Sequence, residues 1–247
     1  IEIDCGSTLR KAISTELRGL YENKVSELQN YLVTLDPEVD QYKHVKTPWL
    51  AYPLVIKKNK KFNMGLSGGN TPKFFYQTFA ELNQENSDIT LWTVDDRHVH
   101  LKDEISNQRM INSIFNITKM NILELQFNED PNKSAEDYSR LVFSKIQSFD
   151  SAILGVGDDG HIASLFPYTN ALNDESIKFV ANEVNILSKW RVTSTFQLLA
   201  EIKNVFLLVT GENKSDILKK IGRDNGLPVN ELIKRRKKTT LVTDQKI

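Results

Sequence analysis

The sequence predicts an α/β protein in which a mostly parallel sheet carries helices on both faces. Short runs rich in apolar and β-branched residues, such as 89–94 and 205–209, alternate with longer segments of helical periodicity. Strands that alternate with helices form parallel sheets covered on both sides. The 247 residues fit one large domain or two small ones, and we expect a single domain over residues 1–247.

The first part of the chain predicts one long helix and one irregular segment. Apolar residues at helical spacing, with charges between them, predict an amphipathic helix over residues 8–33: Ile13, Leu17, Leu20, Leu28 and Leu32. Three prolines and mixed charge predict an irregular segment over residues 34–53, either an insertion or a connection across the surface.

From residue 62 onward strands and helices alternate. The predicted strands are 62–66, 89–94, 152–156 and 205–209, and Leu241 and Val242 close the sheet. One helix opens at Pro72, and another runs from Asn213 to Ile221. A third is expected over residues 134–149, with Ser134 as its N-cap.

Composition excludes several classes of protein. Lys plus Arg and Asp plus Glu both number 32, so the chain lacks the net positive charge of a general nucleic-acid binder. We therefore interpret the basic cluster 234–238 as a solvated face rather than a nucleic-acid patch. The single cysteine, Cys5, excludes an internal disulfide and a cysteine-based zinc cluster. Without a long apolar run, the expected location is cytoplasmic, with no membrane contact.

In parallel sheets, ligands bind beyond the carboxyl ends of the strands. The loop after Leu66 contains Ser67, Gly68, Gly69, Asn70 and Thr71 before Pro72. Two glycines, two hydroxyls and a helix N-terminus fit a phosphate-binding loop. The same residues also fit an ordinary Gly-Gly turn. The loop matches neither common nucleotide-binding pattern.

Two further strand ends carry charge. Val94 is followed by four polar residues, Asp95, Asp96, Arg97 and His98. They form either a solvated turn or a site in which Arg97 neutralises an oxyanion. After Val209, Lys214 either points at an anion or is solvated.

The loop after Val156 contains the strongest catalytic candidate. Two glycines, Gly155 and Gly157, allow a tight exit from the strand. We expect a helix to begin at the turn that follows, with His161 in its first turn, where the helix dipole favours the neutral ring. The carboxylate of Asp159 can hold one ring nitrogen and fix the tautomer. The histidine is thus a candidate base rather than a structural residue.

These motifs together resemble a known family. LSGGNTP, DDRHV with Ser106 and Asn107, GVGDDGHIASLFP, WRVT at 190–193 and LLVTGENKSDIL occur in the order found in 6-phosphogluconolactonases, from about residue 62 onward. The related glucosamine-6-phosphate deaminases continue after the shared Ala as Phe-Asn-Glu-Pro. Here Phe166 stands in the place of the catalytic glutamate, which favours the lactonase.

The resemblance implies a Rossmann-like three-layer fold and hydrolysis of 6-phospho-D-glucono-1,5-lactone in the pentose phosphate pathway, without metal or organic cofactor. It implies His161 as the general base that activates water, Asp95 as a residue that helps to hold that water or the histidine, and Arg97 as the residue that stabilises the oxyanion. The 6-phosphate would bind to Ser67, Gly68, Gly69 and Thr71, with Arg191 closing on it. Some members are fused to glucose-6-phosphate dehydrogenase, which is therefore a candidate covalent or associated partner.

The chain departs from the family pattern at Asn70, His100 and Tyr168, where Ser, Pro and Gly are usual, and over residues 170–189. Three alternatives stay open beside the lactonase. They are an amino-sugar-phosphate isomerase or deaminase, a non-catalytic phosphosugar sensor and, less favoured, a NAD-dependent dehydrogenase.

Overall fold

The main sheet of the computed structural model contains eight strands. The structure describes residues 31–35, 43–46, 60–186, 188–224 and 226–245. The strand order across this sheet is β2-β1-β11-β10-β7-β3-β4-β6. Their bounds are β1 Tyr31–Leu35, β2 Lys43–Lys46, β3 Phe62–Leu66, β4 Ile89–Thr93, β6 Asn121–Leu123, β7 Ser151–Gly155, β10 Asn204–Leu208 and β11 Thr239–Thr243.

From β11 to β6 all neighbouring strands of this sheet are parallel, whereas β1 and β2 add an antiparallel edge. The chain builds outward from β3 through β4 to β6, and then from β7 through β10 to β11 on the other side. The strand order therefore reverses between β3 and β7. In open parallel sheets, the carboxyl ends of strands at such a reversal form a crevice for ligands.

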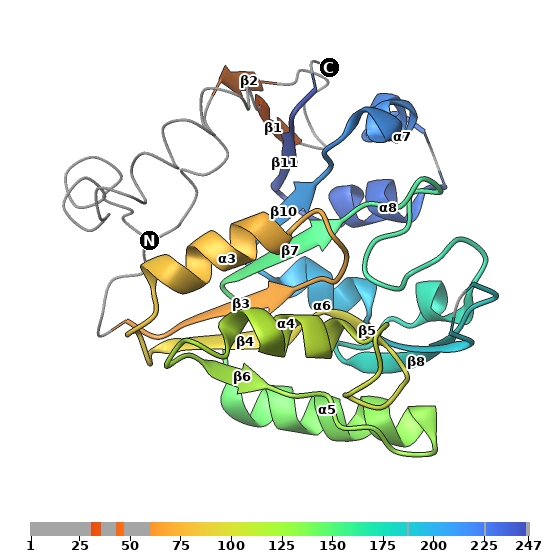
Figure 1. Ribbon diagram of the computed structural model, residues 1–247. Helices are drawn as coiled ribbons and strands as arrows, with labels where there is room; N and C mark the ends of the chain where they lie inside the picture. Colours follow the sequence, from red (N-terminus) through yellow and green to blue (C-terminus); the bar gives the residue numbers. More distant parts are fainter. Residues whose placement is uncertain (1–30, 36–42, 47–59, 187, 225, 246–247) are drawn as a thin grey trace.

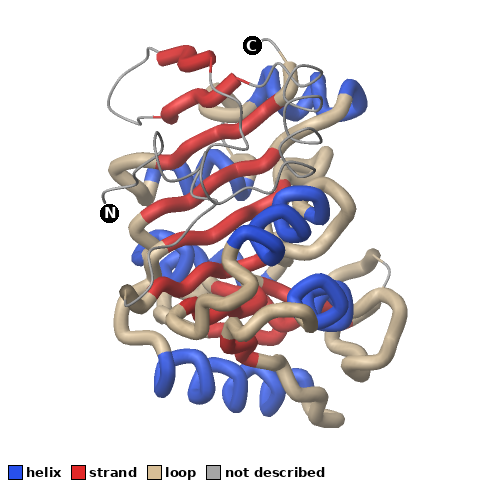
Figure 2. The backbone as a smooth tube through the Cα atoms, turned by 60° about the vertical axis from the view of Figure 1, so that its left-hand side comes forward, coloured by secondary structure: helices blue, strands red, loops and turns tan. Residues whose placement is uncertain are grey.

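Helices cover both faces of the sheet (Figure 1). Alternating side chains of each strand enter two cores: in β7, Ile153 packs on one face, and Ala152 and Leu154 on the other. The first core includes α3 (Lys73–Leu82) and α4 (Asn107–Phe115). The second core includes α5 (Pro131–Lys145), α6 (Phe196–Glu201), α7 (Ser215–Lys220) and α8 (Pro228–Lys234). Figure 2 shows the strands stacked between helices on either side.

A small antiparallel sheet packs against the second core. It contains β5 (Asp95–Arg97), β9 (Trp190–Ser194) and β8 (Phe179–Glu183), in the order β5-β9-β8. The chain passes from β4 into β5 at Val94, whose N–H donates to Leu66 and whose carbonyl accepts from Ser194. This residue therefore joins the two sheets beside the reversal in strand order.

The predicted α/β class is confirmed, with corrections to single elements. Residues 31–33, expected at the end of a helix, belong to β1, because this segment pairs with β11 and not with a preceding helical turn. The remainder of that helix, 8–30, lies outside the described residues. The irregular segment 34–53 contains the end of β1 and all of β2, which pairs with β1.

The helix predicted over residues 134–149 begins earlier and ends earlier, as α5. Its N-cap is Asp130, whose side chain accepts from the Asn132 N–H, and Pro131 occupies the first helical position. Ser134 lies inside the helix and accepts from the Asn128 N–H instead. Aspartate and serine are both common N-caps, so the sequence alone does not distinguish Asp130 from Ser134 as the cap.

The basic cluster 234–238 is only partly solvated. The guanidinium of Arg236 is buried and donates to the carbonyls of Leu199 and Ala200, each at 2.8 Å, at the C-terminal end of α6. Arg235 forms an ion pair with Glu175. The interpretation as a solvated face is therefore wrong for Arg236, because unpaired helix carbonyls require a buried donor.

Candidate active site

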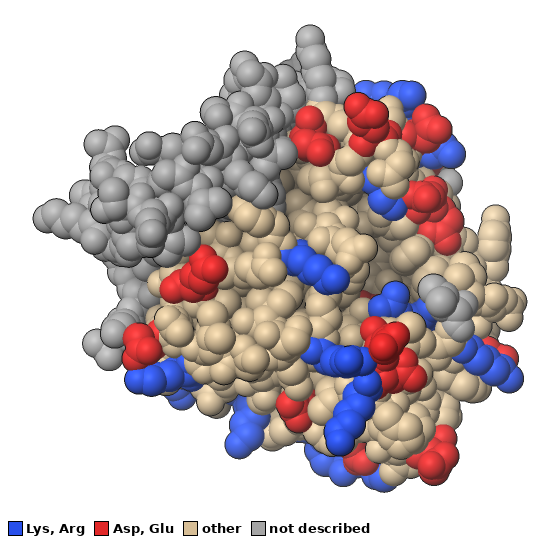
Figure 3. Space-filling view, viewed as in Figure 1, with Lys and Arg blue, Asp and Glu red and all other residues tan. Residues whose placement is uncertain are grey.

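A cavity of about 250 Å³ lies at the carboxyl ends of β3 and β7, where the strand order reverses. The face of the molecule in Figure 3 is hollowed below α7, with charges of both signs around its margin. Eight residues predicted for the site line this cavity: Ser67, Gly68, Gly69, Asp95, Arg97, His161, Arg191 and Lys214. The other three predicted residues, Asp159, Asn70 and Thr71, do not line the cavity. Asp159 is next to it, because its carboxylate contacts the ring of His161.

The loop after β3 is fixed by hydrogen bonds to the neighbouring strand. The N–H of Ser67 donates to the Ile153 carbonyl at 3.2 Å, and its Oγ accepts from the Gly155 N–H at 3.3 Å. Its carbonyl accepts from the Tyr76 hydroxyl at 2.9 Å. A Cβ on Gly68 would overlap the carboxamide of Asn107, so a larger residue there would displace Asn107 from its contacts with Asp95 and Arg97. The first residues of the loop are thus held against β7 and α4.

Strand β5 directs alternate side chains to opposite sides. Asp95 is buried in the cavity wall, and its Oδ2 accepts from the Ser164 hydroxyl at 2.6 Å. Arg97 also lines the cavity, and its guanidinium donates to the carbonyl of Ile105 at 3.0 Å and to Asn107. This pairing leaves part of its donor fork available to a ligand.

Asp96 points away from the cavity into the N-terminus of α4. Its carboxylate accepts from the N–H groups of Asn107 at 2.6 Å and Gln108 at 2.9 Å, and from the Ser106 hydroxyl at 3.0 Å. Burial raises the pKa of Asp96 to about 6, against the opposing effect of these donors. Asp96 therefore anchors α4 to β5 and fixes the position of Asn107.

His161 lies in a loop stabilised by two isolated β-bridges, Val156 with Ile162 and Ile162 with Leu165. The prediction that it occupies the first turn of a helix is wrong, because the chain folds back on Val156 instead of winding onward. The argument from a helix dipole therefore does not apply to this ring. Its orientation comes from side-chain contacts.

Three contacts orient the imidazole of His161. Its Nδ1 lies 2.6 Å from Oδ1 of Asp159, a distance at which Nδ1–H donates and Nε2 keeps its lone pair in the neutral ring. The ring of Phe166 stacks on it with centroids 4.0 Å apart. A Cβ on Gly157 would overlap Nδ1 and Cε1, so the ring lies directly on that glycine.

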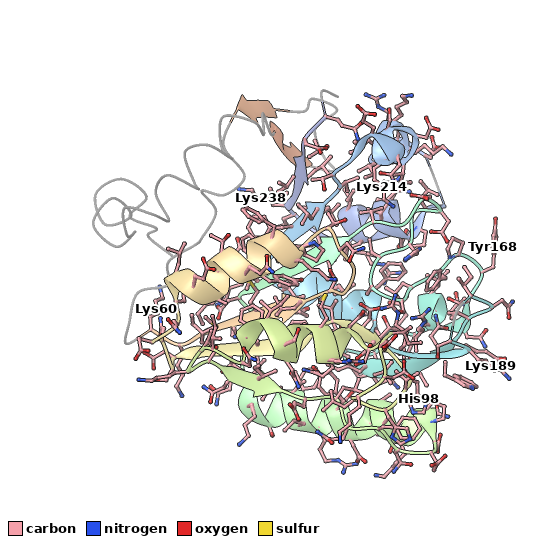
Figure 4. All side chains as sticks on the ribbon, viewed as in Figure 1. Lys60, His98, Tyr168, Lys189, Lys214 and Lys238 are labelled. Atoms are coloured by element: carbon pink, nitrogen blue, oxygen red, sulfur yellow. The ribbon has the colours of Figure 1, made fainter. Side chains whose placement is uncertain are left out.

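Two further cations line the cavity. Arg191 stands opposite Arg97 in the register of β9 and β5 and is buried, with its Nη2 donating to the Ile186 carbonyl. Burial, and next the charge of Arg97, lower the pKa of Arg191. Lys214, labelled in Figure 4, belongs to the 3-10 helix η3 (Glu212–Lys214). Its ammonium lies 2.6 Å from Asp158. Such a cluster of cations suits an anionic ligand.

Sequence reasoning did not assign a role to two side chains that complete the cavity. Asn107 bridges the Asp95 carbonyl and Arg97, and Ser164 holds Asp95. The sequence could have indicated both residues, because Asn107 follows the DDRHV motif and Ser164 lies within GHIASLFP.

In the described part of the chain, no group of three or more His, Cys, Asp or Glu side chains could hold a metal ion. No described helix has the length and apolar character needed to cross a membrane.

Fold and cavity define an α/β protein with a ligand site at the switch point of its sheet, and the cations that line this site suit an anionic ligand. A model of the family described as glucosamine-6-phosphate isomerases/6-phosphogluconolactonase matches residues 51–242. The chain therefore belongs to this family.

Individual relatives agree with the family assignment. A 6-phosphogluconolactonase of Haemophilus influenzae is 33% identical over 175 residues, which cover 66% of this chain and 74% of the relative. The crystal structure of 6-phosphogluconolactonase from Thermotoga maritima is 32% identical, with a TM-score of 0.63 over 69% of this chain and 80% of that one. A monomeric glucosamine-6-phosphate deaminase has the same TM-score at 21% identity, over 73% and 84% of the two chains. The fold is thus shared by both activities.

Proposed function

We propose that this protein hydrolyses 6-phospho-D-glucono-1,5-lactone to 6-phospho-D-gluconate, a step of the pentose phosphate pathway. The observation that carries the proposal is the His161–Asp159 pair beside a cavity that also contains Arg97. The names of the relatives at 32–33% identity support the same activity.

In the proposed reaction, Nε2 of His161 takes a proton from a water molecule as the water oxygen attacks the lactone carbonyl. Arg97 stabilises the negative oxygen of the tetrahedral intermediate. Asp95, held by Ser164, lies where it can orient the water. The intermediate then collapses by breaking the bond to the ring oxygen, which receives the proton from the imidazolium. Water addition and ring opening leave the histidine neutral again.

The phosphate of the substrate would bind at the other side of the cavity. The proposal assigns it to the N–H and hydroxyl groups of the loop Ser67, Gly68, Gly69, Asn70 and Thr71, together with Arg191 and Lys214. Binding of a remote phosphate orients the carbonyl toward the base and so lowers the entropic cost of the attack.

Phe166 supports hydrolysis over deamination. Deamination with isomerisation needs several proton transfers, and this position offers an apolar ring stacked on His161 in place of a carboxylic acid. The ring leaves His161 with one task, the activation of water.

The test is acid release from freshly generated phosphogluconolactone by the purified protein. We expect acceleration above spontaneous hydrolysis, and a loss of about 10²–10⁴-fold in His161→Ala. The matched control is His100→Ala, since His100 is outside the cavity lining and packs on Phe127. A wild-type protein that gives no acceleration, or that releases ammonia from glucosamine 6-phosphate, would refute the proposal.

Four accompanying expectations stay predictions: one domain, no cofactor, a cytoplasmic location and association with glucose-6-phosphate dehydrogenase. Co-purification with that dehydrogenase tests the last of them.

A further inference from the structure

The mouth of the cavity carries an ion pair that the proposed reaction does not use. The ammonium of Lys214 lies 2.6 Å from Oδ1 of Asp158. The Lys214 side chain is 20% exposed and lines the cavity, whereas the Asp158 side chain is 77% exposed and is not among the lining residues. The pair therefore joins the loop after β7 to the loop after β10 at the solvent boundary of the site.

The carboxylate of Asp158 is held on a fixed turn. The Gly160 N–H donates to the Gly157 carbonyl at 3.0 Å, which closes a four-residue turn with Asp158 and Asp159 at its two central positions. Gly160 has a φ of 79°, and its carbonyl accepts from the Val229 N–H at the start of α8. From this turn Asp159 contacts His161, and Asp158 contacts Lys214.

The lysine has a fixed backbone but an adaptable side chain. Its N–H donates to the Gly211 carbonyl at 2.9 Å, and the Gly211 N–H donates to Asp244. Four methylene groups and a rotatable ammonium allow the charge to move from one acceptor to another. The carboxylate of this pair is largely exposed, and ion pairs that solvent reaches are weak, so a stronger anion can displace the carboxylate.

We propose that Asp158 is a specificity-determining residue, because its carboxylate pairs with Lys214 and competes for that ammonium with the phosphate of the substrate. A phosphate carries more charge than a carboxylate and offers three acceptor oxygens, so it recruits Lys214 where a ligand with only a carboxylate does not. The inference rests on the proposed function insofar as Lys214 binds the phosphate. It adds that the affinity for phosphate is limited by an internal competitor.

The experiment measures binding of inorganic phosphate to the full chain by titration calorimetry, a readout that does not depend on turnover. In Asp158→Asn we expect the dissociation constant to fall about two- to fivefold, as release of one exposed ion pair predicts. The matched control is Asp216→Asn, which removes another exposed carboxylate, one that pairs with Lys219 on α7. In this control we expect no change.

A double-mutant cycle separates direct competition from the long-range effect of removing a negative charge. Lys214→Met should weaken phosphate binding, and Asp158→Asn should then have no effect in the Lys214→Met background. A similar gain in both backgrounds, weaker binding in Asp158→Asn, or no effect in either background would overturn the inference. If the cycle behaves as expected but the wild type hydrolyses no phosphogluconolactone, the inference stands and the proposed function fails.

Discussion

Gly157 is the residue on which the position of His161 depends. Because a Cβ there would overlap the imidazole, Gly157→Ala should displace the ring from Asp159 and from the cavity. We expect phosphogluconolactone hydrolysis to fall by at least about tenfold, a part of the roughly 10²–10⁴-fold that general-base catalysis contributes. Steady-state rates of the purified variant measure the effect.

Gly155→Ala is the matched comparison, since Gly155 also lines the cavity but a Cβ there meets no protein atom within 4 Å and so leaves His161 in place. It adds the same methyl group two residues away, and we expect a smaller loss of activity. Equal losses in the two variants would show that the collision with His161 is not the cause.

Asp159 provides a second prediction at this scale. Its carboxylate fixes the proton of His161 on Nδ1, so Asp159→Asn should allow the wrong tautomer and lower kcat by about 10–100-fold. KM should change little, because Asp159 does not line the cavity. A change mainly in KM, with kcat preserved, would contradict this role.

The C-terminal end of α6 depends on one buried guanidinium. Arg236 donates to the carbonyls of Leu199, Ala200 and Lys203, and burial lowers its pKa to about 10, so it stays charged at neutral pH. We expect Arg236→Met to lower the free energy of unfolding by about 2–4 kcal/mol, because several carbonyls lose their donor. Denaturant unfolding measures the difference.

Lys237→Met is the control for this prediction, since Lys237 is exposed in the same basic cluster. Exposed substitutions of this kind change stability by about 0.5 kcal/mol or less. Equal effects at the two positions would support the solvated face that the sequence predicted and would contradict the capping role of Arg236.

Elements were predictable where local pattern and tertiary role agree. The run ITLWTV at residues 89–94 is rich in apolar and β-branched residues, and its side chains enter both hydrophobic cores, one on each face of the sheet. Residues 31–33 were not predictable, because their strand exists through pairing with β11, more than 200 residues away in the chain. Likewise, the bridge from Ile162 to Val156 replaces the helix that the turn at Asp158 suggested.

At the scale of the molecule, the position of the site is set by the place where the chain passes from the main sheet into the small sheet. The order of the parallel strands reverses beside β3, and Val94 carries the chain from β4 into β5. Strand alternation therefore predicted which loops meet at one edge, including those of Ser67, Asp95 and His161. It could not predict the pairing of β5 with β9, which brings Arg191 opposite Arg97.

Because the cavity is lined by residues from both sheets, ligand binding should stabilise the whole fold. A ligand present at a hundred times its Kd stabilises the native state by about 2.7 kcal/mol, and each kcal/mol raises Tm by about 2–4 °C at this chain length. We therefore expect saturating 6-phosphogluconate to raise Tm by about 5–10 °C in thermal unfolding. His161→Ala should keep most of this shift, since its proposed role is in water activation, and an Arg191→Met variant should lose most of it. Loss of the shift in His161→Ala alone would show that the histidine binds the ligand rather than activating water.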